Sequence, residues 1–255
     1  MPDAPRRLPT PPPPPAAPGA GPDPALRHWV AAHLGDLADG GPGAVAGSPR
    51  FRGGQTAADA ALAALDLRGY AATRNEVWPE DRRGATALSP WIRHGLLPLP
   101  RVWAAAADAP ARDRDRFRDE LLWQEYARHL QARLGPRLGA GLRRELPPSL
   151  PPGTDPWRED RDAGMACLEL VLGELDEDGW LTNQARMWVA SHWAVRAGAD
   201  WREGEDALFR RLLDGSRAAN RLGWQWTAGT ATGRPYGFSR WQVEKRAPGL
   251  CATCP

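Results

Sequence analysis

The chain has 255 residues and a net charge of +2 at pH 7, a length that allows one large domain or two small ones. A nearly neutral balance excludes a strong overall field as a reason for binding nucleic acid. The basic residues are almost all arginine, with Lys245 the only lysine, and arginine can grip a phosphate through two hydrogen bonds. There is no run of about 18 apolar residues and, in residues 1–24, no apolar signal segment, so we expect a cytoplasmic protein.

The N-terminal part begins with a proline-rich leader. Residues 1–24 hold too much proline to bury a core, and we expect them to be disordered or extended. Apolar residues at helical spacing then predict a helix over residues 25–38, which the Gly/Pro stretch 40–49 ends. Residues 51–75 predict a turn followed by an Ala/Leu-rich helix with Thr56 as its N-cap.

Residues 84–95 have the composition of an anion-binding loop. The hydroxyls of Thr86 and Ser89 and the backbone N–H groups of a helix start suit a phosphate, because unpaired amides and the helix dipole both favour negative charge. An ordinary helix start at the Ser-Pro pair accounts for the same residues. Taken alone, the stretch leaves both interpretations open.

The clearest helical pattern lies in the middle of the chain. Residues 114–134 predict an amphipathic helix with a continuous apolar stripe. Residues 135–162 are rich in Pro, Gly and Arg and predict a long surface loop that contains Trp157. Periodicity resumes at residue 163 and predicts a helix that ends near Gly179.

Residues 179–226 combine tryptophans, paired charges and asparagines in helical sequence. Trp is hard to bury completely and its indole N–H needs an acceptor, so this mixture favours a polar, flat-walled pocket for an aromatic ligand. A helical core built from tryptophan explains the composition equally well. The tryptophans stand at positions 180, 188, 193, 201, 224 and 226.

Five segments in order resemble the flavin-binding helical domain of the DNA photolyase/cryptochrome family. They are ATALSPWIRHG, RFRDELLWQEYARHL, GWLTNQARM, DWREGEDALFRRLLDGSRAAN and GWQWTAGTATG. Together they extend over roughly 190 residues, which is more specific than any single short motif. The resemblance begins near residue 51 and implies an all-α domain over residues 25–250 that encloses one FAD.

The resemblance implies a set of cofactor-binding residues. Asn183 and Arg186 would contact the isoalloxazine ring, with Arg186 paired to Asp214, and such a pair favours a reduced, anionic ring. Asn220 would face N5 of the flavin, where an amide cannot supply the proton that an acid can. The other implied contacts are Tyr70, Thr86, Leu88, Ser89, Gln124 and Ser216.

The activity implied by the resemblance is light-driven electron transfer from reduced FAD to pyrimidine dimers in DNA, as in a deoxyribodipyrimidine photolyase. Glu120 would hydrogen-bond the dimer and Trp123 would stack on it. Without the family, Glu120 is simply an exposed charge on a helix. Trp224 and Trp201 would form the electron relay to the flavin. The rest of the implied catalytic set is Asn183, Met187, Asn220 and Trp226.

Several positions depart from the family pattern. Gln124 stands where the family has a flavin-contacting arginine, Ser216 replaces an aspartate, and Ala85 replaces the first threonine of the phosphate loop. Only about fifty residues precede the resemblance, too few for a doubly wound sheet, so we expect the family's antenna domain to be absent. Gln124, Ser216 and the missing antenna domain favour an alternative function, a cryptochrome-like blue-light photoreceptor that acts on a protein partner without repairing DNA.

Cys251 and Cys254 form a CxxC pair in the tail 251–255. A bare CxxC is usually coincidental or a redox pair, and three cysteines are too few for a disulfide framework. Some bacterial members of the family carry a [4Fe–4S] cluster, and Cys167 matches the position of another of its ligands. The resemblance therefore implies three of the four thiolates that a cluster requires. A buried Cys167 beside a loose tail is the alternative interpretation.

Overall fold

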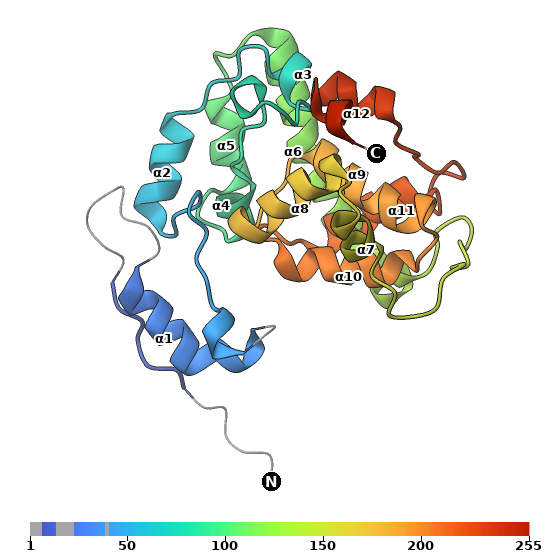
Figure 1. Ribbon diagram of the computed structural model, residues 1–255. Coiled ribbons are helices and arrows are strands. Elements are labelled where there is room, and N and C mark those ends of the chain that lie inside the picture. The colour runs from blue at the N-terminus through green and yellow to red at the C-terminus, as the bar shows by residue number, and fades with distance from the viewer. Residues whose placement is uncertain (1–6, 14–22, 39–40, 255) are drawn as a thin grey trace. The chain divides into compact units, whose positions relative to one another are not determined.

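The computed structural model describes residues 7–13, 23–38 and 41–254, so most of the leader that we predict to be disordered lies outside the described residues. The chain divides into two compact units, Met1–Ala57 and Ala58–Pro255. Within the described residues every regular element is a helix, which confirms the all-α prediction (Figure 1). None of these helices is long and apolar enough to cross a membrane.

In its described residues, the first unit contains helix α1, two short 3-10 turns and the first residues of α2. Asp23 caps the helix by accepting a hydrogen bond from the N–H of Ala25 at 2.9 Å. The helix ends earlier than we predicted, because the chain tightens into a 3-10 turn at Gly35. The elements of this unit are α1 (Pro24–Leu34), η1 (Gly35–Leu37) and η2 (Pro42–Ala44).

The second unit holds the remaining helices, with α2 crossing the boundary between the units. In chain order they are α2 (Gln55–Ala63), α3 (Tyr70–Thr73), η3 (Glu80–Arg82), α4 (Ser89–Arg93), α5 (Leu99–Ala105), α6 (Ala111–Leu134), η4 (Gly135–Gly139), α7 (Pro156–Asp162), α8 (Ala166–Asp178), α9 (Asn183–Ser191), the π-helical η5 (His192–Arg196), α10 (Trp201–Arg211), α11 (Arg217–Ala228), α12 (Arg240–Arg246) and η6 (Leu250–Thr253).

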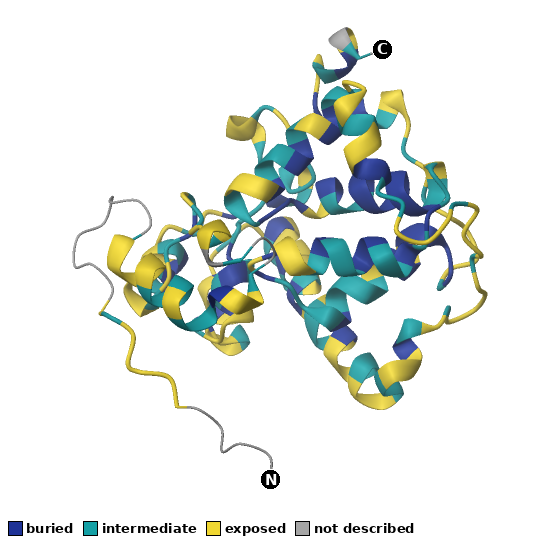
Figure 2. Ribbon diagram, turned by 60° about the horizontal axis from the view of Figure 1, so that its bottom comes forward, coloured by how far each residue is buried: buried dark blue, intermediate teal, exposed yellow. Residues whose placement is uncertain are grey.

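Two hydrophobic cores stabilise the second unit. The smaller core is built by α2 to α6 and includes Leu88, Val102 and Phe117. The larger core is built mainly by α7 to α12, and the buried residues follow the faces that these helices turn toward one another (Figure 2). Helix α11 packs against both α6 and α9, so it stands between the two groups of helices.

Tryptophan fills much of the larger core. Five indoles of this core are at most 4% exposed, whereas Trp226 is 47% exposed. The structure therefore settles the question that the composition left open: most of the tryptophans are core residues, and Trp224 also forms part of a cavity wall. The five buried indoles of the larger core are Trp157, Trp188, Trp193, Trp201 and Trp224.

The segment 135–162 is more ordered than its composition suggests. The prediction of one long surface loop is wrong at both ends, where η4 and α7 form. Trp157 is only 2% exposed, and its Nε1 donates to the carbonyl of Val189 at 2.9 Å. Burial of this one large side chain fixes α7 against the core. The surrounding Pro, Gly and Arg residues do not predict this burial.

Two helix boundaries also test the sequence predictions. Helix α8 ends at Gly179, which has a φ of +68° and closes the helix in the left-handed conformation, as we predicted. Thr56 is not an N-cap, because α2 begins one residue earlier, at Gln55.

Candidate active site

A cavity of about 150 Å³ lies between α9 and α11. A single water needs only about 10–15 Å³, so the cavity has room for a much larger group. Seven of the predicted site residues share its wall: Asn183, Arg186, Met187, Asp214, Ser216, Asn220 and Trp224. Ala190, Ala219, Gly223 and Thr227 complete it.

Arg186 and Asp214 form an ion pair in this wall. Nη2 of Arg186 lies 2.7 Å from Oδ2 of Asp214, and Nε donates to the carbonyl of Leu181 at 3.0 Å, so the guanidinium is held from two sides. The other carboxylate oxygen of Asp214, Oδ1, is buried and has no hydrogen-bond partner among the described residues. Leaving a buried acceptor without a hydrogen bond costs about 1–3 kcal/mol, so this oxygen is suited to accept a hydrogen bond from a bound ligand.

Asn220 is oriented by a buried glutamate. Its Nδ2 donates to the carbonyl oxygen of Glu205 at 3.0 Å and to Oε1 of Glu205 at 2.9 Å. Because both partners are acceptors, the amide nitrogen must face Glu205, which leaves the amide oxygen for the cavity. Glu205 is fully buried, and Arg217 and Arg221 neutralise it at 2.8 and 2.9 Å.

Two residues shape α11 where it meets the cavity. Ser216 is the N-cap of α11, and its hydroxyl accepts from the N–H of Ala219 at 3.4 Å. Gly223 lies in the interior of the helix, and a Cβ added there would meet no atom within 4 Å. Because glycine has no side chain, it leaves this part of the cavity wall open, and its low helix propensity costs about 1 kcal/mol.

Asn183 and Met187 stand one turn apart on α9. Thr182 caps the helix by accepting from the N–H of Ala185 at 3.3 Å, which fixes where Asn183 begins the first turn. Nδ2 of Asn183 lies 3.7 Å from Sδ of Met187. The two side chains therefore form one continuous part of the cavity wall.

The indole that approaches Trp224 is one that the sequence did not single out. The ring centroids of Trp224 and Trp157 are 6.1 Å apart, and Trp157 meets Trp193 at 4.7 Å. Gly204 makes this packing possible, because a Cβ added there would collide with the Trp224 ring. Trp201, the predicted relay partner, is fully buried and carries the guanidinium of Arg202 4.6 Å above its ring.

Three residues with predicted roles toward DNA do not line the cavity. Glu120 is paired with Arg74, whose Nε lies 3.2 Å from Oε1. Trp123 is 62% exposed and meets Tyr126 edge-on, with ring centroids 5.6 Å apart. Trp226 is exposed as well. Gln124, between the buried and exposed faces of α6, is half-buried and also lies outside the cavity.

Tyr70 is a core residue in this structure. Its ring meets that of Phe117 edge-on at 5.4 Å, and burial raises the pKa of its phenol above the ordinary value. The N–H groups of Gly69 and Ala71 donate to Asp113 at 3.0 and 2.8 Å, which fixes the start of α3. Tyr70 is not part of the cavity wall.

The predicted phosphate loop is also engaged by the protein itself. Oγ of Ser89 accepts a hydrogen bond from Nε1 of Trp180 at 2.9 Å. Leu88 is buried in the smaller core, and Thr86 is half-buried. None of the three belongs to the cavity wall, so their predicted contacts with a cofactor remain predictions.

The cysteines lie near one another without forming a metal site. All three are free, and η6, which contains Cys251 and is followed by Cys254, packs against α8, which carries Cys167. Burial, followed by the neighbouring thiols, raises the pKa of Cys167 to about 11. No group of three His, Cys, Asp or Glu residues able to hold a metal occurs in residues 7–13, 23–38 and 41–254, so the iron–sulfur prediction is not supported.

Helical bundles build their cofactor sites from side chains on facing helices, and the cavity here, with its arginine, buried carboxylate and oriented amide, has that arrangement. The sequence profile described as the FAD binding domain of DNA photolyase matches residues 117–243. The chain belongs to the DNA photolyase/cryptochrome family, and the part that it matches is the family's FAD-binding domain.

Known relatives agree with this assignment. A deoxyribodipyrimidine photo-lyase of Thermus thermophilus is 32% identical over 72% of the chain and 44% of its own length. A protein of the same name from Vibrio cholerae is 28% identical over 74% of the chain and 43% of its own length. The chain therefore spans less than half of the length of these relatives.

Solved structures show the same fold. A class III photolyase of Agrobacterium tumefaciens superposes with a TM-score of 0.63 at 26% identity, over 77% of this chain and 43% of that one. A cryptochrome of Synechocystis superposes with a TM-score of 0.67 at 24% identity, over 78% and 44% of the two chains. The fold is thus common to photolyases and cryptochromes and does not separate the two activities.

Proposed function

We propose that the cavity between α9 and α11 binds the isoalloxazine ring of FAD and that the chain acts as a photolyase-like lyase on pyrimidine dimers in DNA. The observation that carries this proposal is the unpartnered buried oxygen of Asp214 beside Arg186 in the cavity wall. The cavity wall offers an acceptor at Asp214 and a donor at Arg186, and this combination suits a ring that has both N–H and carbonyl groups. The cavity is smaller than the 300–1,000 Å³ typical of ligand pockets, so it suits the ring rather than the whole dinucleotide.

The residues around the cavity would control charge and protons at the ring. FAD, when bound and reduced, supplies the electron that light transfers to the dimer. Arg186 holds a positive charge at the wall and favours negative charge on its neighbour. Asn220 presents an amide, which has no titratable proton, and Glu205 prevents that amide from turning. Trp224 closes the wall with an apolar face that excludes water.

The substrate side would use the exposed aromatic residues. Trp123 and Trp226 offer free indole faces on which an unpaired base can stack, at about 1–3 kcal/mol for each base. Glu120 would hydrogen-bond the dimer after exchanging part of its contact with Arg74. The names of the curated relatives support this substrate class, since both are deoxyribodipyrimidine photo-lyases.

Two measurements test the proposal, first the flavin content and then the repair activity. The purified full-length chain should show the absorption of bound FAD, and illumination should remove dimers from a dimer-containing oligonucleotide. Glu120→Ala and Asn220→Asp should each reduce repair strongly. The matched control is Glu125→Ala, since this residue stands on the same helix in a partly exposed pair with Arg128. A colourless protein, or unchanged repair in both test variants, would contradict the proposal.

A second candidate function is a blue-light photoreceptor without repair activity. The observation that favours it is the ion pair of Glu120 with Arg74, which occupies the carboxylate proposed to meet the dimer. Gln124, in place of the family's arginine, adds a second departure. The same experiment separates the two functions: a photoreceptor would bind FAD and change its spectrum in light but would leave dimers intact, and its target would be a signalling protein.

A further inference from the structure

Two of the three free thiols belong to one turn near the C-terminus. Cys251 lies in η6 and Cys254 follows that element, and the N–H of Cys254 donates to the carbonyl of Cys251 at 3.3 Å. A four-residue turn closed in this way holds its first and last Cα atoms within about 7 Å, and a disulfide joins Cα atoms about 4.4–6.8 Å apart. The backbone of the reduced chain therefore already has the form that an intramolecular disulfide requires.

Glu244 fixes this turn from α12. Its Oε2 accepts from the N–H of Gly249 at 2.8 Å, and its Oε1 accepts from the N–H of Cys251 at 2.7 Å. Gly249 has a φ of +81°, which lets the chain fold back toward the helix. The two backbone hydrogen bonds lower the pKa of the Glu244 carboxyl group, so at neutral pH it is ionised and both bonds are charge-assisted.

The two thiols differ in their access to solvent. Cys251 is 7% exposed and belongs to the larger core, whereas Cys254 is half-buried and packs against that core. The carbonyl of Cys254 accepts from Nη2 of Arg240 at 3.0 Å, so this end of the turn is also tied to α12. A small solute therefore reaches the sulfur of Cys254 more easily than that of Cys251.

This pair has no place in the site described above. Neither cysteine lines the cavity between α9 and α11, and within the part of the chain that the structure describes neither belongs to a group able to hold a metal. Two thiols separated by two residues and held in one turn are the reactive unit of dithiol–disulfide exchange, because the second thiol can displace whatever is bound to the first.

We propose that Cys251 and Cys254 form a reversible dithiol–disulfide site that reacts with low-molecular-weight disulfides such as glutathione disulfide. Glu244 is a positioning residue, since it holds the backbone turn that keeps the two sulfur atoms near each other. The inference goes beyond the proposed function, because the reaction requires neither a flavin nor DNA.

The reaction consists of two exchange steps. In the first, the Cys254 thiolate attacks one sulfur of glutathione disulfide; a mixed disulfide forms, the S–S bond of the reagent breaks and one glutathione thiolate leaves. In the second, the Cys251 thiolate attacks the sulfur of Cys254 and displaces the second glutathione. The chain loses two electrons and two protons, and glutathione disulfide gains them to become two molecules of glutathione.

Equilibration in glutathione buffers tests the proposal. The full-length chain is incubated without oxygen in mixtures of reduced and oxidised glutathione, quenched with acid, alkylated and digested with trypsin without a reductant. Cleavage after Arg246 releases residues 247–255 as one peptide that contains both cysteines. Mass spectrometry should show this peptide without alkyl groups and lighter by two hydrogen atoms, while Cys167 stays alkylated.

The dependence on glutathione identifies the product. The oxidised fraction should fall with the square of the glutathione concentration, because two molecules are released for each disulfide formed, whereas a mixed disulfide would follow the first power. Cys254→Ser should abolish the internal disulfide, and Cys167→Ala should leave it unchanged. A disulfide between Cys167 and either tail cysteine, or no internal disulfide in any mixture, would overturn the proposal.

The role of Glu244 is tested by the same measurement. Glu244→Ala should lower the ratio of oxidised to reduced chain in a given buffer by about tenfold, because the turn loses both of its charged-acceptor hydrogen bonds. Glu244→Gln, which keeps one acceptor oxygen, should lie between this variant and the unmodified chain. The control is Glu177→Ala, at an exposed position of α8. Equal ratios in Glu244→Ala and the control would show that Glu244 does not position the thiols.

Flavin content separates this inference from the proposed function. If the disulfide forms as expected in a chain that contains no flavin and repairs no dimers, the thiol site stands and the photolyase function fails. If the chain binds flavin and repairs dimers but forms no internal disulfide, the function stands and the thiol site fails. Thermal unfolding of each variant shows whether its fold is intact.

Discussion

Two regions of the second unit carry the family resemblance, and they differ in how far the polar groups of their matched residues are satisfied. Between α9 and α11, Asp214 keeps a buried oxygen without a partner in the described chain, and Gly223 leaves open space beside it. Around α3, α4 and α6, Ser89 accepts from Trp180 and Glu120 pairs with Arg74. In the first, or open, region a matched residue thus has hydrogen-bonding capacity left for a ligand, whereas in the second, or closed, region the matched side chains Ser89 and Glu120 are engaged by the protein itself.

This difference separates matched residues that indicate a ligand site from matched residues that stabilise the fold. When a residue that matches the family has a buried donor or acceptor without a partner, it indicates a ligand site. The reason is that an unsatisfied buried group costs free energy, which a hydrogen bond to a ligand can offset. A matched residue whose capacity is already used holds the fold until a ligand displaces its partner.

The largest effect is expected at Glu205, which supports the open region. Glu205→Ala should lower the free energy of unfolding by about 3 kcal/mol, because it leaves Arg217 and Arg221 without their buried partner. It should also weaken FAD binding, because Asn220 loses its anchor. Urea unfolding and flavin titration measure the two effects.

The neighbouring Asp206 provides the control for this change. It also contacts Arg217 but is half-exposed, so Asp206→Ala should cost less than about 1 kcal/mol. Equal losses of stability in the two variants would mean that the buried cluster does not support the cavity.

A smaller effect is expected in the closed region. Ser89→Ala should lower the free energy of unfolding by about 1–2 kcal/mol, because the indole N–H of Trp180 loses its acceptor. The affinity for FAD should be unchanged, because the hydroxyl is already used within the protein. A tenfold loss of FAD affinity at unchanged stability would show that Ser89 is a phosphate ligand and would break the contrast.

The smallest effect on stability has the opposite sign. Gly223→Ala should raise the free energy of unfolding of the flavin-free protein by about 0.5–1 kcal/mol, because alanine favours the helix and meets no atom. The added methyl group should nevertheless weaken FAD binding, since it enters the cavity.

Gly173 in α8 is the matched control, because a Cβ there also meets nothing within 4 Å and the residue is not in the cavity wall. Gly173→Ala should stabilise the protein equally and leave the flavin affinity unchanged. If the Gly223→Ala variant binds FAD with the same affinity as the control variant, the flavin ring does not lie in this cavity.

The fold was predictable from the sequence to a large extent. The helical periodicity of residues 114–134 and the glycine stop at Gly179 correspond to α6 and to the end of α8. Trp157 was not predictable, because its burial depends on contacts with Val189 and Trp193 that are distant in sequence. Composition assigned its segment to a loop, and tertiary packing overrode that tendency.

The candidate site was predictable through the resemblance and not through spacing. Asn183, Arg186, Asp214 and Asn220 come from separate segments, and only the fold brings them to one cavity. The supporting residue Glu205 was missed. Glu205 lies among partly exposed charges on α10, and nothing in the local pattern distinguishes the one glutamate that is buried.

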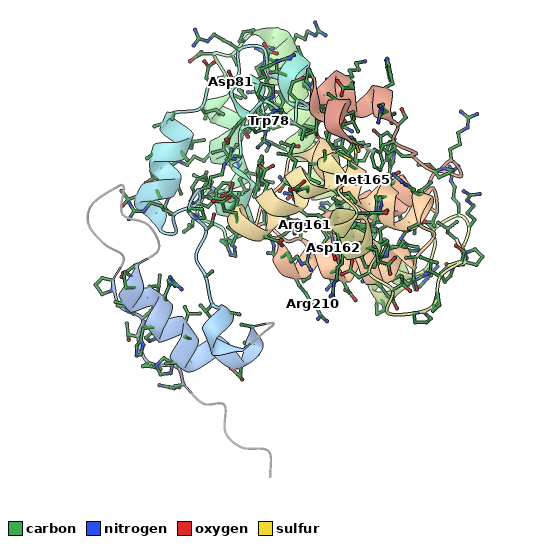
Figure 3. All side chains as sticks on the ribbon, viewed as in Figure 1. Trp78, Asp81, Arg161, Asp162, Met165 and Arg210 are labelled. Carbon is green, nitrogen blue, oxygen red and sulfur yellow. The ribbon has the colours of Figure 1, made fainter. Side chains whose placement is uncertain are left out.

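The most direct test of the account is the affinity of the flavin-free full-length chain for FAD, measured by titration, in Asp214→Asn and in Asp162→Asn. The second variant removes the same charge at an exposed position of α7, labelled in Figure 3. We expect Asp214→Asn to weaken binding by about 10- to 100-fold, because the ion pair with Arg186 and the free acceptor are both lost, and Asp162→Asn to leave it unchanged. The same affinity in both variants would contradict the assignment of the cavity between α9 and α11 to the flavin.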